Sequence, residues 1–163
     1  MSATLQGVDA RTYLSRWLDA VVGMYIADIN ALPDDKWNHN FGGVARPASD
    51  LTADALSLLV WTNEALKGNF LADNEQEGYK KLQAVCATKS DSISALQAAA
   101  TDFAGAISNA SDEDLNKVIT TPFGMEMPLF MVAQVAVSHI WYHDGQLNYK
   151  QALLGDEKVH WMG

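Results

Sequence analysis

The chain has 163 residues, of which 48% are hydrophobic and 19% are charged. This composition is typical of one globular domain, which we expect to cover residues 1–163. The formal net charge of -9 argues against binding to nucleic acid or to an anionic membrane surface, because both depend on clustered Lys and Arg. No apolar run approaches the roughly 20 residues that a membrane-spanning helix needs.

Cysteine usage and the first residues indicate the compartment. Cys86 is the only cysteine, so a disulfide within the chain is impossible. The opening segment lacks the basic and apolar regions of a secretory signal. Both observations predict a cytoplasmic protein, and Cys86 itself is expected to be a small buried hydrophobe.

Two long helices are expected in the first half of the chain. Between Asp9 and Asn30 apolar residues recur every three or four positions, as on one face of a helix, and Asp9 is suited to cap its start. A polar loop rich in Gly, Asn and Pro follows. A second helix is expected to begin with Ser49 or Asp50 as its N-cap and to stop at Gly68.

The middle of the chain is also helical in pattern. A shorter helix is expected over residues 75–87 and a longer one over residues 92–108, with Ser90 or Asp91 as the cap that separates them. Residues 111–115 then have the pattern of a single capped turn.

The last part of the chain completes the predicted architecture. Residues 118–128 indicate an extended, turn-rich connector. Pro128 is suited to the first position of a last long helix, and Gly155 is suited to end it. The result is four main helices without strand-like alternation of any length. This pattern predicts an all-α, antiparallel four-helix bundle.

The last helix carries the residues with the clearest chemistry. His139 and His143 are four residues apart, so their side chains are expected on one face, about 5–6 Å apart, where they can share a metal ion. Gln146 follows on the same side as a partner for a ligand. Catalytic zinc usually has three protein ligands, and a facing helix is the natural source of the third. Asp54 is the preferred candidate, with Asp50 one turn earlier as the alternative.

These residues also have ordinary structural explanations. A His pair at this spacing is more often a surface or core pair than a metal site. An acidic residue near a helix start more often stabilises the positive end of the helix dipole than binds metal. His39 in the polar loop and His160 near the C-terminus are expected to be solvated, and Trp61, Trp141 and Tyr142 to fill space between helices.

A family resemblance supports the metal interpretation. Residues 138–149, SHIWYHDGQLNY, follow the segments Thr121–Gly124 (TPFG) and Met127–Leu129 (MPL). Together they resemble the last helix of the DinB/YfiT-like superfamily, which carries His-x-x-x-His and then Gly-Gln-Leu after a Gly-x-x-x-Pro-Leu lead-in. The resemblance extends weakly over most of the chain. It implies an up-down-down-up four-helix bundle that holds a divalent metal, commonly zinc or nickel, through three side chains.

The sequence departs from the family pattern at one ligand. The family's third ligand is a His near the start of the second helix, whereas the matching position here is at or near Asp54, and the second helix contains no His. A set of two His and one carboxylate suits catalytic zinc and also non-heme iron(II). The departure is also compatible with a protein that has lost the metal site of the family.

Two functions are therefore expected as alternatives. The resemblance implies a metal-dependent enzyme that acts on a small molecule by thiol transfer, with a low-molecular-weight thiol, or by hydrolysis. We also expect a homodimer. The missing family His motivates the alternative, a non-catalytic bundle that dimerises or binds a small ligand or a protein without metal.

Overall fold

Four long helices make up most of the computed structural model, which describes residues 9–70 and 75–162. They are α1 (Ala10–Ala31), α2 (Ala48–Leu66), α4 (Lys89–Asn109) and α6 (Leu129–Leu153). The expectation that the first residues carry no secretory signal concerns residues 1–8 in part, and those lie outside the described residues. In the part of the chain that is described, no helix is long and apolar enough to cross a membrane.

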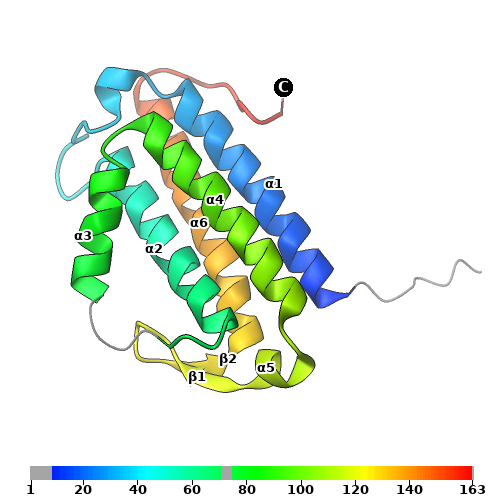
Figure 1. Ribbon diagram of the computed structural model, residues 1–163. Coiled ribbons are helices and arrows are strands. Elements are labelled where there is room, and N and C mark those ends of the chain that lie inside the picture. The colour runs from blue at the N-terminus through cyan, green and yellow to red at the C-terminus, as the bar shows by residue number, and fades with distance from the viewer. Residues whose placement is uncertain (1–8, 71–74, 163) are drawn as a thin grey trace, which may run out of the picture.

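The helices form the predicted up-down-down-up bundle (Figure 1). Helix α1 packs against α4 and α6, and α2 packs against the same two helices. Helices α1 and α6 run in one direction and α2 and α4 in the other (Figure 1). The short helix α3 (Glu75–Val85) packs along α2 and returns the chain to the end at which α2 began. This crossover allows α2 and α4 to be parallel neighbours.

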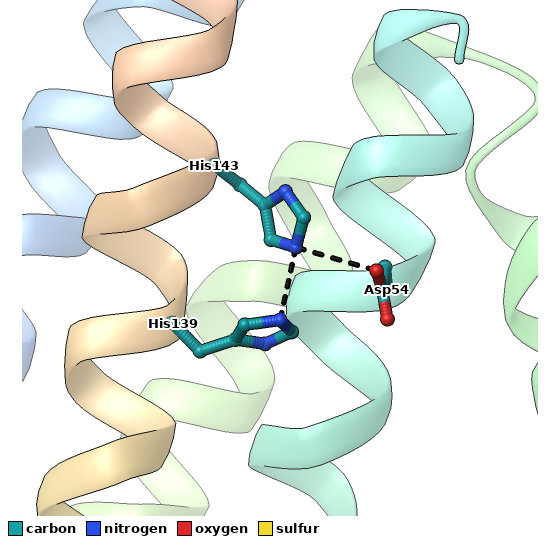
Figure 2. A group of neighbouring side chains, drawn as sticks. All are labelled: Asp54, His139 and His143. Atoms are coloured by element: carbon teal, nitrogen blue, oxygen red, sulfur yellow. Dashed lines mark hydrogen bonds and ion pairs between the residues drawn. The ribbon is translucent and has the colours of Figure 1, made fainter. Parts of the chain in front are cut away.

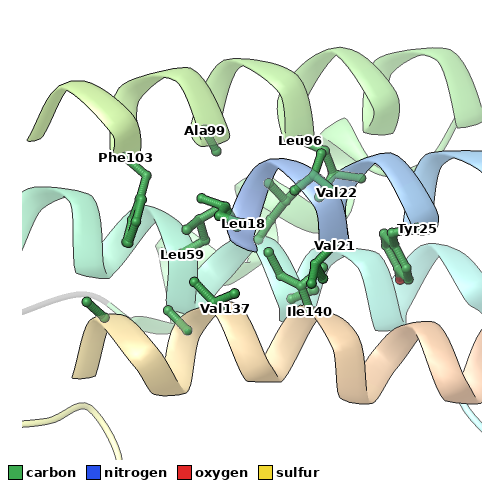
Figure 3. Close-up of a cluster of buried hydrophobic side chains, with 14 of the residues drawn as sticks. Leu18, Val21, Val22, Tyr25, Leu59, Leu96, Ala99, Phe103, Val137 and Ile140 are labelled. Carbon is green, nitrogen blue, oxygen red and sulfur yellow. The ribbon is translucent and has the colours of Figure 1, made fainter. Parts of the chain in front are cut away.

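Apolar stripes from all four long helices meet in one core (Figure 3). The stripes follow the three- and four-residue spacing that the sequence predicted. Each large side chain in them contributes about 1.5–3 kcal/mol to stability when it is fully buried. The central members are Leu18, Val21, Val22 and Tyr25 of α1, Leu59 of α2, Leu96, Ala99 and Phe103 of α4, and Val137 and Ile140 of α6.

Helices α2 and α4 begin earlier than the sequence indicated. The N-cap of α2 is Pro47, whose side chain has no polar atom to cap the helix. The Ser49 backbone N–H donates instead to the Trp37 carbonyl at 3.2 Å. The N-cap of α4 is Thr88, whose Oγ1 accepts from the Asp91 backbone N–H. Asp91 is therefore the third residue after the cap rather than the cap.

The predicted extended, turn-rich connector forms a small hairpin. Strands β1 (Val118–Thr120) and β2 (Glu126–Pro128) are antiparallel, with Ile119 paired to Met127. Each strand has only three residues, which is too short to produce a visible alternation in the sequence. Gly124, with φ +79°, supplies the positive φ that the connecting turn needs. Pro128 ends β2 and caps α6 instead of being the first helical residue.

Two shorter elements complete the chain. A 3-10 turn, η1 (Asp34–Lys36), lies in the loop after α1, and the five-residue helix α5 (Asp112–Asn116) follows α4. Ser111 and Asp114 form a reciprocal capping box at the start of α5, as the capped-turn prediction required. Trp37 anchors the loop after α1, because its buried indole Nε1 donates to the Cys86 carbonyl at 2.9 Å.

A buried pair of carboxyl groups lies between α1 and α6. Asp28 and Asp144 are both almost completely buried. Asn148 Nδ2 donates to Asp28 Oδ2 at 2.8 Å, and Gln151 Nε2 donates to the Asp28 carbonyl oxygen at 2.9 Å. Burial, reinforced by Asp28 beside it, raises the pKa of Asp144 from 3.8 to about 8. Asp144 is therefore largely protonated in the folded protein at neutral pH.

This pKa makes stability depend on pH. Between about pH 4 and about pH 8 the folded chain keeps a proton on Asp144 that the unfolded chain has released, so the free energy of unfolding falls as the pH rises. Asp144→Asn imitates the protonated carboxyl group and is expected to flatten this fall, which leaves the variant more stable than the parent above about pH 8. Urea unfolding at several pH values measures both slopes. Parallel slopes for parent and variant would contradict the assignment.

Candidate metal centre

The two histidines of α6 face the start of α2. The buried side chains of α6 recur every three or four residues, and they include His143 and Ile140. His139 lies one turn before His143 on the flank of this stripe that is turned toward α2. Asp54, in the second turn of α2, projects toward both imidazole rings from the opposite side (Figure 2).

The ligand-type atoms of these three residues converge. His143 Nε2 lies 3.1 Å from His139 Nε2 and 3.4 Å from Asp54 Oδ2. One such atom from each residue lies within 4.8 Å of the other two. Two ligands of a tetrahedral zinc ion, each about 2.0–2.1 Å from the metal, are about 3.3 Å apart. The separations of His143 from His139 and from Asp54 thus match those of two ligands on one divalent cation, and all three residues lie within 4.8 Å of one another.

Gln146 sets the orientation of the His143 ring. Gln146 Nε2 donates to the Tyr142 hydroxyl at 3.1 Å. Its Oε1 lies 2.8 Å from His143 Nδ1 and accepts the Nδ1 proton. Nε2 on the other side of the ring then faces His139 and Asp54. Ligand histidines in metal sites are held in the same way, by a hydrogen bond at the other ring nitrogen.

Arg46, in the loop before α2, completes the electrostatics of the cluster. Arg46 Nη1 lies 2.8 Å from Asp54 Oδ2. The hydrogen bond from His143, followed by the contact with Arg46, holds the pKa of Asp54 well below its usual range. Burial, followed by the charge of His143, lowers the pKa of His139. Asp54 is therefore anionic and His139 neutral, which are the protonation states that metal ligands need.

The donor set fits a divalent metal. Two imidazole nitrogens and one carboxylate oxygen lie within 4.8 Å of one another, and each would offer an electron pair to a metal that displaced the proton between them. Within residues 9–70 and 75–162, the solvent-sealed His139 Nδ1 has no hydrogen-bond partner, so nothing there fixes the proton on Nδ1. Nitrogen and carboxylate ligands in this combination suit zinc, nickel and iron(II).

Asp50, the alternative third ligand, is engaged elsewhere. Its Oδ1 accepts from the Tyr79 hydroxyl at 2.8 Å and from Gln83 Nε2 at 2.7 Å, both in α3. Its Oδ2 lies 3.8 Å from Arg46 Nε. Of the two carboxylates that the sequence offered, only Asp54 lies with the His pair.

Of the other candidates from the sequence, Tyr142 is exposed and contacts the His143 ring, whereas His39, His160 and Trp141 have other neighbours. The His39 ring contacts Phe41 edge to face, and His160 Nε2 lies 2.8 Å from Asp156 Oδ2. Trp141 packs against Trp17 of α1 with ring centroids 5.2 Å apart. Cys86 is buried, as expected, and burial raises the pKa of its thiol, which argues against a nucleophilic role.

The fold is similar to solved structures. No protein-family model and no curated protein matches the sequence. A DinB-like protein from Bacillus subtilis (YjoA) is similar in structure, with a TM-score of 0.64 and 15% sequence identity over 88% of this chain and 92% of that one. The chain has a DinB-like fold. The resemblance drawn from the last helix is therefore confirmed at the level of the fold.

A second solved structure with a similar fold is that of an enzyme. The mycothiol-dependent maleylpyruvate isomerase is similar with a TM-score of 0.63 and 10% identity over 84% of this chain. The chain spans 60% of the length of that isomerase. A point mutant of the same isomerase matches with the same values. At these identities the likeness concerns the fold alone.

Proposed function

We propose that this DinB-like chain is a metal-dependent enzyme whose divalent cation is held by Asp54, His139 and His143. The convergence of one carboxylate oxygen and two imidazole nitrogens within 4.8 Å of one another is the observation that carries the proposal. The expected metal is zinc or nickel, with iron(II) as a further possibility for this ligand set.

The chain's own residues prepare this site. Gln146 holds the His143 ring with Nδ1 toward itself and Nε2 toward the cluster. Arg46 keeps Asp54 charged and directed toward the His pair. A bound divalent cation with three protein ligands supplies an open position, where it lowers the pKa of a bound water or thiol near to neutral.

The reaction class follows from that chemistry and from the second structural neighbour. A metal-activated thiol favours transfer of a low-molecular-weight thiol to a small-molecule substrate, and a metal-activated water favours hydrolysis. The mycothiol dependence stated for the isomerase of the same fold supports thiol chemistry. We further propose that the protein is a cytoplasmic homodimer, and its free, buried Cys86 is in keeping with a reducing compartment.

Cobalt(II) substitution tests this proposal. The cobalt-loaded protein is titrated with 2-mercaptoethanol while its absorption spectrum is recorded. We expect a thiolate-to-cobalt charge-transfer band in the parent, because one position of the metal is open to solvent. Asp54→Asn is expected to lose the band, because the third ligand is weakened.

Asp50→Asn provides the matched control. Asp50 lies one turn earlier on α2 and also faces Arg46, but it does not contact the His pair. The control variant is therefore expected to keep the band. Cobalt binding without a thiolate band would favour hydrolysis over thiol transfer. Failure to bind cobalt in the parent would favour the non-catalytic bundle.

A further inference from the structure

Lys150 of α6 is a mostly buried lysine that follows the candidate ligand His143 by seven residues. The residue is only 5% exposed, and Nζ lies 4.6 Å from the centroid of the Phe41 ring. Within the described parts of the chain, residues 9–70 and 75–162, Nζ has no hydrogen bond or ion pair. Nζ keeps some contact with solvent, so a ligand can reach it.

A buried ammonium group without an anionic partner is unfavourable. Taking a charge out of water costs free energy that a cation–π contact offsets only in part. Burial, followed by the positive charge of Arg46, lowers the pKa of Lys150. Lys150 itself therefore lacks a compensating negative charge, which a bound anion would supply.

Lys150 and Arg46 approach the metal centre from two separate segments. Lys150 lies seven residues after His143, two helical turns along the same face of α6. Its Nζ lies over the ring of Phe41, which belongs to the same loop before α2 as Arg46. Arg46 contacts Asp54 through Nη1 and Asp50 through Nε, and its side chain is still 40% exposed. Its Nη2 thus remains available as a donor.

We propose that Lys150 and Arg46 form a binding subsite for the anionic oxygen group of a small-molecule substrate, a carboxylate or a phosphate, next to the candidate metal centre. This inference specifies the substrate class of the proposed function, and it rests on that function for the reaction that the subsite would serve. Anion binding itself requires only the two cations, and it is therefore testable without metal.

Calorimetric titration of the chelator-treated, metal-free protein tests the subsite. Malonate and inorganic phosphate are titrated separately, with uncharged malonamide as the control for malonate. We expect saturable binding of at least one anion and none of malonamide, and the tighter anion identifies the source of the anionic group. Lys150→Met is expected to weaken binding roughly tenfold or more, because a charge-assisted hydrogen bond is lost. Lys150→Arg is expected to keep most of it.

Two further variants control for charge and folding. Lys158→Met removes an exposed lysine after the end of α6 and is expected to leave the affinity unchanged, which separates local contact from overall charge. Arg46→Gln alters a partly exposed loop residue and is expected to weaken anion binding as well. It therefore keeps the test decisive if Lys150→Met fails to fold.

The outcomes separate the subsite from the metal site. Absence of binding of both anions to the parent, or unchanged affinity in Lys150→Met and Arg46→Gln, would overturn the subsite. A third outcome is a parent protein that binds an anion through Lys150 and Arg46 and yet binds no divalent metal. That result would support the subsite and contradict the proposed metal-dependent function.

Discussion

Replacing His143 with alanine is expected to abolish divalent metal binding. His143 is the central member of the cluster, since its Nε2 lies 3.1 Å from His139 Nε2 and 3.4 Å from Asp54 Oδ2. Its loss leaves two ligands on separate helices. Loss of a residue that hydrogen-bonds to a metal ligand typically weakens metal binding by about 10–100-fold. We expect loss of the ligand itself to raise the dissociation constant for zinc by more than that. Competition with a fluorescent zinc chelator measures the affinity of the parent and the variant.

Gln146→Ala is the graded control for this result. The variant keeps all three ligand side chains but removes the acceptor 2.8 Å from His143 Nδ1. It is expected to weaken zinc binding by about 10–100-fold, which lies between the parent and His143→Ala. Circular dichroism verifies that both variants remain helical. Equal zinc affinity in the parent and in a folded His143→Ala variant would contradict the assignment of this ligand.

Replacing Phe103 with alanine is expected to cause the largest loss of stability. The Phe103 side chain of α4 is fully buried in the core that the four long helices share. Truncating a buried Phe to Ala removes its packing contacts and leaves a cavity, which costs about 3–5 kcal/mol. Urea unfolding followed by circular dichroism measures the change in the free energy of unfolding.

Phe123→Ala provides the matched control in the turn between β1 and β2. Phe123 is 48% exposed, so its truncation is expected to change the free energy of unfolding by no more than about 0.5 kcal/mol. A similar loss in both variants would mean that α4 is not packed into the core as described. Because α4 contacts both α1 and α2, that result would also remove the support that positions Asp54.

The parts of the site that lie within one helix were predictable from the sequence. The four-residue spacing of His139 and His143 fixes their relation through helix geometry alone. The position of Gln146 follows from the same geometry, and its side chain accepts a hydrogen bond from His143. Asp54 required a relation between two helices, which spacing does not provide. The family resemblance directed attention to it, and the structure places it rather than Asp50 beside the His pair.

The two cations near the centre were not predicted. Arg46 lies in an irregular loop, where no periodicity relates its position to α6. Lys150 had a usable signal, because seven residues after His143 is the same helical face, but a lysine there is ordinarily solvated. The start of α2 was missed for a similar reason, because the backbone of Ser49 pairs with Trp37, outside the helix. The cap of α4 is local, since Thr88 accepts from the Asp91 backbone N–H, and its Thr-x-x-Asp pattern was available in the sequence.

Anomalous X-ray diffraction from crystals of the zinc-loaded protein tests the central claim most directly. The account predicts one strong peak at the zinc absorption edge, about 2.0–2.2 Å from Asp54 Oδ2, His139 Nε2 and His143 Nε2. The same measurement on Asp54→Asn crystals is expected to show a weaker peak or none. A parent crystal without a peak at this position, or with zinc bound by other residues instead, would contradict the account.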